Sequence, residues 1–170
     1  MSNRRRVEIY TSFLRLSGEL EGLADERLTD LVSVPGPCLE LCNAAVEPVT
    51  EHHLRLGQGV ERLSVVKASI SLVCPRDVVE EAARHREAWR EKERVSVQLN
   101  SQAFSMVCEV HLEPGGELED HLCGNGVGFV PVTNLSALWL SGPGEPRSVQ
   151  RGFGLVNSAY LVGFAPAPPR

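Results

Sequence analysis

Histidine and cysteine are the side chains of this sequence that could bind a metal ion. Two pairs lie close together along the chain: Cys108 with His111, and His121 with Cys123. Residues two apart share one face of a strand, so His121 and Cys123 would point the same way in an extended segment. A zinc site needs three or four converging ligands, and no second group with a recognisable spacing accompanies either pair. The adjacent His52-His53 lies in a polar stretch and is expected to be solvated, so we expect no metal site and no cofactor.

The cysteines could also act as nucleophiles, which requires a neighbouring base and a lowered thiol pKa. There are five: Cys38, Cys42, Cys74, Cys108 and Cys123. Cys38 and Cys42 would share a strand face with Glu40, whereas Cys74 and Cys108 lie among apolar residues, where cysteine usually serves as a small hydrophobe. We therefore expect no catalytic cysteine. The odd count, with no CxxC motif, is typical of reduced thiols and predicts a cytoplasmic protein.

Two aspartates occur in similar settings, Leu28-Thr29-Asp30-Leu31 and Leu118-Glu119-Asp120-His121-Leu122. Paired carboxylates can share a proton or bind a metal. Aspartate also caps short helical turns, and we favour capping for both residues, although the sequence leaves open whether they do more.

The glycine-rich stretch Gly124-Asn125-Gly126-Val127-Gly128 has the composition of a phosphate-binding loop. It lacks the lysine of the P-loop motif and does not open a helix after a strand. Its Asn-Gly pair is instead typical of a tight hairpin turn. The sequence also lacks a Ser-centred GxSxG motif, so we do not expect an enzyme.

Composition limits the partners. The 170 residues are 42% hydrophobic and 23% charged, which is typical of a soluble globular protein, and the net charge is −5. No segment is strongly basic, so binding to nucleic acid is not expected. The basic cluster Arg4-Arg5-Arg6 is expected to lie in a solvated, disordered N-terminus. The uncharged stretches 122–144 and 152–169 are interrupted by Gly, Pro and Asn, so we expect no membrane span.

Four blocks of the sequence recur in the same order at an offset of 89 to 91 residues, and Asn43 then falls on Asn134. The matching blocks are 12–22 with 103–113, 27–33 with 117–123, 39–46 with 130–138, and 59–75 with 148–166. This pattern indicates an internal duplication, with one unit at 7–75 and a second at 96–166.

Within each unit the apolar residues alternate with a period of two, as in Ile9, Thr11 and Phe13 or in Val95, Val97 and Leu99. Turn signals such as Pro35-Gly36-Pro37 separate these runs. Short strands at this spacing favour a small barrel for each unit. Because about 70 residues is close to the lower limit for an independent core, the units are expected to pack on each other or on a partner chain.

Residues 76–95 differ from both units, because they contain no Gly or Pro and many good helix formers. Asp77, followed three residues later by Glu80, matches a capping box and predicts a helix that connects the units. Its apolar stripe is narrow and includes one large aromatic residue, Trp89. An isolated Trp on a charged surface is a frequent interface anchor, so we expect Trp89 at a contact with a second copy. The alternative is that Trp89 folds back on one of the barrels.

The order of these elements resembles an uncharacterised bacterial family of small β-domains, a domain of unknown function, here in two tandem copies. The corresponding element of that family is roughly leucine, serine, aspartate, then leucine-asparagine; Leu28-Thr29-Asp30-Leu31 matches it best, and the second copy departs from it by inserting His121. More distantly, size and strand order are similar to the Sm and SH3-like small barrels. The resemblance covers nearly the whole chain, once per unit. It implies a fold and no chemistry.

The expected architecture is therefore mainly β, with two tandem small Sm/SH3-like β-barrels at 7–75 and 96–166 joined by one α-helix at 76–95. The expected function is a non-enzymatic binding or assembly module that self-associates or binds another protein. The alternative is an Sm-like or ligand-sensing regulator that binds RNA or a small molecule between the units. The sequence does not identify a ligand, the number of copies that assemble or a pathway.

Overall fold

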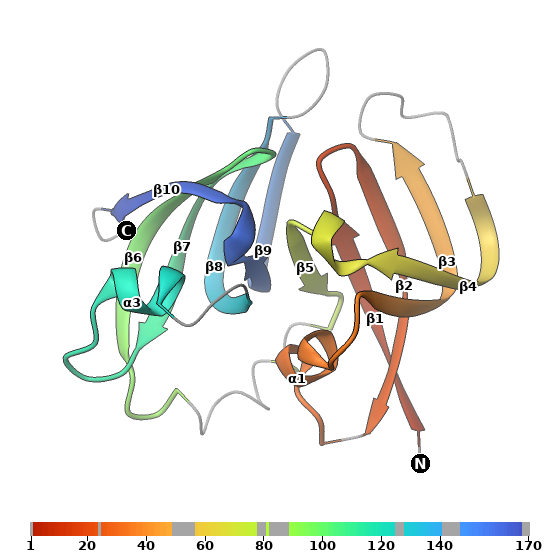
Figure 1. Ribbon diagram of the computed structural model, residues 1–170, viewed down its shortest axis with the longest axis horizontal. Coiled ribbons are helices and arrows are strands. Elements are labelled where there is room, and N and C mark those ends of the chain that lie inside the picture. Colours follow the sequence, from red (N-terminus) through yellow and green to blue (C-terminus); the bar gives the residue numbers. More distant parts are fainter. Residues whose placement is uncertain are drawn as a thin grey trace.

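The computed structural model describes residues 2–23, 25–48, 57–77, 81, 89–124, 128–140 and 147–167 (Figure 1). The first half of the chain contains β1 (Ser2–Tyr10), β2 (Leu14–Leu23), α1 (Leu28–Ser33), β3 (Cys38–Pro48), β4 (Gly57–Val66), η1 (Lys67–Ser69) and β5 (Leu72–Pro75). The second half contains β6 (Glu93–Ser101), β7 (Phe104–Leu112), α3 (Leu118–Cys123), β8 (Phe129–Trp139), β9 (Arg147–Asn157), η2 (Ser158–Tyr160) and β10 (Leu161–Pro166). The protein is thus mainly β, as predicted. In the described part of the chain, no helix has the length and apolar character needed to cross a membrane.

The ten strands in the described part of the chain belong to one antiparallel sheet, in the order β10-β6-β7-β8-β9-β5-β1-β2-β3-β4. Figure 1 shows that this sheet curls into two lobes, one for each half of the chain. The sheet does not close into a barrel, so the prediction of two separate barrels is corrected. The reason is that β5, which would have to pair with β4 to close the first lobe, pairs with β9 of the second half instead.

Elements follow each other in the same order in the two halves, and each half has its strands in the order fifth, first, second, third, fourth. Two details recur as well. Asn43 and Asn134 are the described non-glycine residues with positive φ, both at 50°, a conformation that asparagine tolerates well. In the first hairpin of each half, a hydroxyl accepts two backbone N–H bonds, at Thr11 and at Ser101. Duplication of an ancestral unit remains our interpretation of these parallels.

Two clusters of buried side chains form the core, and each one contains residues from both halves. The core of the second half includes Tyr10 and Leu72 of the first half. The core of the first half includes Phe153 and Leu155, both on β9. Each half therefore buries apolar side chains of the other, which is the reason for their close association.

Half of the predicted connecting helix at 76–95, residues 78–80 and 82–88, lies outside the described residues, and the described residues 89–91 form a turn. The backbone carbonyl of Asp77 accepts the Glu81 N–H at 3.3 Å, as in one helical turn. Residues 93–95, at the end of the predicted range, belong instead to β6. Glu81 is buried and anchors this segment to the first half, because its carboxylate accepts the N–H of Leu28 at 2.7 Å and pairs with Arg5 at 3.4 Å.

The N-terminal arginines are not in a disordered tail. Arg4, Arg5 and Arg6 lie in β1, which is paired on one side with β2. Arg4 forms ion pairs with Glu19 and Glu21 of β2, while Arg5 is buried against Glu81. The prediction was wrong because it read the run of charges alone, whereas acidic residues from β2 and from the connecting segment neutralise it.

Candidate functional site

The contact between the halves, which we call the junction, is centred on the pairing of β5 with β9. Leu72 lies opposite Val156, and Val73 lies opposite Leu155. Asn157 extends this short pairing: its backbone N–H donates to the carbonyl of Ser71 at 3.0 Å, and its side-chain amide donates to the carbonyl of Ile70 at 2.8 Å. Since all of these residues are buried, the junction continues the sheet through the interior of the protein.

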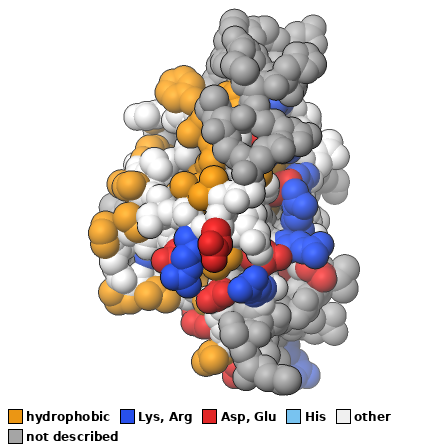
Figure 2. Space-filling model, turned by 90° about the vertical axis from the view of Figure 1, so that its right-hand side faces the viewer, with side chains coloured by type: hydrophobic (Ala, Val, Ile, Leu, Met, Phe, Trp, Pro, Cys, Tyr) orange, Lys and Arg blue, Asp and Glu red, His pale blue; other side chains and the backbone are white. Residues whose placement is uncertain are grey.

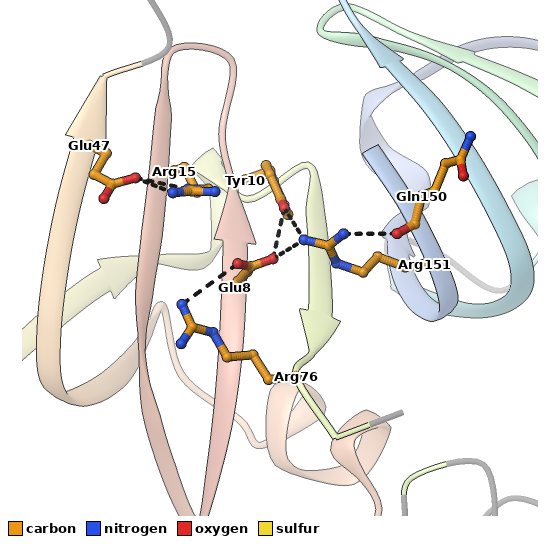
Figure 3. A network of polar contacts seen from close by, with 7 residues as sticks. All are labelled: Glu8, Tyr10, Arg15, Glu47, Arg76, Gln150 and Arg151. Atoms are coloured by element: carbon orange, nitrogen blue, oxygen red, sulfur yellow. Dashed lines mark hydrogen bonds and ion pairs between the residues drawn. The ribbon is translucent and has the colours of Figure 1, made fainter. Parts of the chain in front are cut away.

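A polar network lies beside this pairing and connects the halves through side chains (Figure 3). Glu8, buried on β1, accepts a hydrogen bond from the Tyr10 hydroxyl at 2.9 Å. The guanidinium of Arg151, from β9, donates to the same carboxylate oxygen of Glu8, and Arg76 approaches the other oxygen at 3.7 Å. A second guanidinium nitrogen of Arg151 donates to the backbone carbonyl of Gln150 at 2.8 Å. The network therefore holds β9 of one half against β1 of the other.

The electrostatics of this network keep Glu8 ionised. Burial is the largest influence and raises the pKa of Glu8, but the hydrogen bonds from Arg151 and Tyr10, together with nearby positive charge, lower it below the ordinary value. Burial and the adjacent carboxylate raise the pKa of Tyr10. Glu8 is thus a carboxylate with two donors at one oxygen and a guanidinium beside the other. This arrangement is better suited to a structural contact between β1 and β9 than to a catalytic base, which must reach a substrate proton.

Trp89 lies at the junction too. Its half-buried ring stacks on His111 of β7, with ring centroids 4.3 Å apart and planes inclined by 11°, and lies 5.8 Å from the ring of Phe153. The His111 Nε2 is 2.9 Å from the hydroxyl of Thr133. Burial, the main cause, lowers the pKa of His111 to about 4. Trp89 therefore packs within its own chain, and its contact with a second copy stays a prediction.

A groove of about 660 Å³ opens between the two halves, and we call it the inter-half groove. The first half contributes the end of α1, the loop that follows it and η1, and the second half contributes the start of β8 and η2. Apolar side chains dominate the lining, including Val34, Val66, Phe129 and Tyr160. The sequence suggested a ligand site between the units only in general terms and did not identify these residues.

The two aspartates behave differently although they occupy corresponding helices. Asp30 lies in the first turn of α1, where its carboxylate accepts the backbone N–H of Arg27 at 3.3 Å and pairs with the Arg27 guanidinium at 2.9 Å. Asp30 therefore contributes to capping from the third helical position, as in a capping box, while the N-cap residue itself is Arg27. Asp120 lies in the first turn of α3, where its backbone carbonyl accepts the N–H of Gly124 at 2.9 Å. The described contacts do not join the two carboxylates into one site.

The candidate metal ligands do not converge. His121 and Cys123 lie on the helix α3 rather than on a strand, and residues two apart on a helix do not face each other. Among the described residues, no group of three or more His, Cys, Asp and Glu side chains could hold a metal ion. His52-His53 and the centre of the glycine-rich stretch, residues 125–127, lie outside the described residues.

The cysteines divide by exposure: Cys38 and Cys123 are exposed, whereas Cys42, Cys74 and Cys108 are buried. Burial, the largest cause, raises the pKa of the Cys74 thiol to about 12, which opposes formation of the reactive thiolate.

Sequence reasoning missed Glu8 and Arg151. A signal for Glu8 is present, because a carboxylate between Val7 and Ile9 in an otherwise apolar run requires a partner if both faces of the strand are buried. Nothing in the sequence marks Arg151, which lies 143 residues away from Glu8.

Comparisons of the chain with protein-family models, with curated proteins and with solved structures found no match.

Proposed function

We propose that this protein is a non-enzymatic assembly module that binds further copies of itself through the two ends of its sheet. The observation that supports the proposal is the identity of the end strands. The sheet order ends at β4 and at β10. These are the counterparts, one in each half, of β9 and β5, which already pair with each other at the junction. An exposed strand edge is a template for pairing with another chain.

The registers of the strands define which residues would meet. The strand pairs β3–β4 and β8–β9 correspond at an offset of 91 residues, which makes Val65 the counterpart of Val156. A comparison of the pairs β1–β5 and β6–β10 makes Gly163 the counterpart of Leu72. A second copy that repeated the junction would place Gly163 of its β10 opposite Val65. Val66 would then meet Val162, as Asn157 meets Ser71 inside the chain.

The exposure of these positions favours such a contact. Asn157 and Ser71 are 4% and 3% exposed at the junction, whereas their counterparts Val66 and Val162 are 51% and 69% exposed. Two apolar side chains thus face solvent where the same positions are covered inside the chain. Covering them would contribute favourable burial free energy at about 25 cal/mol per Å² of apolar surface.

The outer contact would be weaker than the junction. Arg62 and Ser64, both exposed, are the counterparts of the buried Phe153 and Leu155. Arg62 is paired with Glu40 on the neighbouring strand at 3.3 Å. Figure 2, which looks at the side where Figure 1 places β3 and β4, shows positive and negative side chains interspersed over its centre. We therefore expect reversible, concentration-dependent association in a head-to-tail arrangement.

The test is the mass of the protein in solution, measured by sedimentation or light scattering across a concentration series. The wild-type chain is expected to form oligomers at high micromolar concentration, and Val66→Lys and Val162→Lys are each expected to return it to a monomer. Leu138→Lys is the matched control, because Leu138 is exposed but lies on β8, which has a partner on both sides. A wild-type chain that stays monomeric would overturn the proposed function.

Trp89→Ala is measured in the same series to test the predicted role of Trp89. Loss of oligomers with retained thermal stability would support a role in the contact between copies. Oligomers that persist in Trp89→Ala would contradict that role and leave the sheet edges as the contact.

A further inference from the structure

The inter-half groove has the features of a ligand site, and its composition restricts the ligand. Its volume of about 660 Å³ falls in the usual range for small-molecule sites, about 300–1,000 Å³, which commonly lie between domains. Val34 and Val66, two of the exposed large hydrophobic residues of the described chain, both line it. Together with Phe129 and Tyr160 they offer an apolar surface that water covers at a free-energy cost.

The charge of the groove lining restricts the ligand further. Among the described residues that line the groove, Lys67 alone carries a charge. Its ammonium group donates to the carbonyl of Val34, another lining residue, which places the positive charge at the groove. An ammonium group has three N–H donors, so this bond leaves donors for an anion.

The remaining polar side chains are few. Asn157 is occupied, because its amide donates to Ile70 and its oxygen accepts the N–H of Ala159 at 3.1 Å. The hydroxyl groups of Ser33 and Tyr160 complete the polar lining. The groove thus combines one cation with a mainly apolar wall.

We propose that the inter-half groove binds an amphiphilic anion, a molecule with an apolar chain or ring system and one carboxylate that pairs with Lys67. This site goes beyond the proposed self-association, but the two share Val66, so the ligand and a second copy would compete for that side chain. The halves contribute to the groove jointly, so a bound ligand would contact both sides of the junction.

The first test is isothermal titration calorimetry with straight-chain carboxylates from hexanoate to dodecanoate, each used below its micellar concentration. Burial of one methylene contributes about 0.8 kcal/mol, so affinity is expected to rise roughly 4-fold per added carbon until the groove is filled. Decan-1-ol and decyltrimethylammonium are the charge controls and are expected to bind more weakly than decanoate. No saturable binding of decanoate, or equal binding of the cation, would overturn the proposal.

Variants then locate the binding. Lys67→Met is expected to weaken decanoate binding roughly 10-fold, because a hydrogen bond to a charged group is lost, and to leave decan-1-ol binding unchanged. Lys67→Arg keeps the charge and is expected to bind decanoate. An equal loss for decanoate and decan-1-ol in Lys67→Met would contradict the assigned ion pair.

Gly128→Leu tests the groove itself. Gly128 lines it, and a Cβ at this position would meet nothing within 4 Å, so a side chain can begin there without a clash and would add bulk at the groove. We expect it to abolish binding of both decanoate and decan-1-ol. Gln102→Leu adds leucine at an exposed turn between β6 and β7 and is the matched control. Unchanged binding in Gly128→Leu, with the wild-type fold retained by circular dichroism, would place the ligand elsewhere and refute the proposal.

Discussion

Removing Arg151 tests whether the polar network at the junction holds the two halves together. In Arg151→Met the Glu8 carboxylate loses the guanidinium that donates to it, and the Tyr10 hydroxyl loses a contact at 3.3 Å. Hydrogen bonds to charged groups contribute about 1.5–3 kcal/mol to stability. Arg76 and the Tyr10 hydroxyl remain beside Glu8, so the carboxylate is not left without donors. We therefore expect the free energy of unfolding to fall by about 2 kcal/mol.

The matched control is Arg15→Met, which removes a surface pair from the same region. Arg15 donates to Glu47 at 3.0 Å, but their side chains are 41% and 35% exposed, compared with 31% and 9% for Arg151 and Glu8. Exposed ion pairs contribute only about 0–1 kcal/mol. The comparison separates a charge at the junction from a charge on the surface, with methionine introduced in both variants.

The assay is urea denaturation, supported by thermal melting. For a chain of this size, each 1 kcal/mol of destabilisation lowers Tm by about 2–4 °C, so Arg151→Met should melt about 4–8 °C below wild type. Arg15→Met should melt within about 4 °C of it. A loss in Arg151→Met no larger than the loss in Arg15→Met would refute the argument that this network ties the halves together.

Two further predictions concern His111 and Phe153. Because the pKa of His111 is lowered to about 4, the unfolded chain binds a proton near pH 6.5 that the folded chain does not. Stability should therefore fall as the pH drops from 6.5 to 4. His111→Gln should reduce the difference in Tm between pH 7.5 and pH 5, and an unchanged difference would contradict this. Phe153→Ala should lower the free energy of unfolding by about 3–5 kcal/mol in urea denaturation, whereas Phe13→Ala, at an exposed site, should change it by less than about 0.5 kcal/mol. Similar effects of the two variants would be evidence against a shared core.

The mainly β character of the chain could be predicted from the sequence, because it depends on local patterns. Alternating apolar residues and turn signals indicated several strands, although Thr11 and Phe13, which were assigned to one strand with Ile9, lie in the turn between β1 and β2. The offset that aligned Asn43 with Asn134 also paired residues with the same unusual backbone conformation. The strand that pairs with β5 could not be predicted from local sequence patterns. Pairing with β4 or with β9 satisfies the same backbone hydrogen bonds, and the choice depends on packing between residues far apart in the chain.

The same limit applies to the junction and the groove. Glu8 and Arg151 come together only because β9 lies against the first half. The inter-half groove forms where loops of the two halves meet, so no single stretch of sequence contains it. The N-terminal arginines were predicted wrongly for the same reason. Taken alone they indicate a solvated tail, but acidic residues of β2 form ion pairs with them in the fold.

The exchange of side chains across the junction explains why two halves of similar design form one sheet. Each half has about the minimum length for an independent core. Phe153 and Leu155 complete the core of the first half, while Tyr10 and Leu72 complete the core of the second. At the outer edges the counterparts of Phe153 and Leu155 are the polar Arg62 and Ser64, which removes the apolar contact that would fuse another copy permanently. The chain thus joins its own halves tightly, and in the self-association that we propose it would meet further copies only by reversible contacts at its edges.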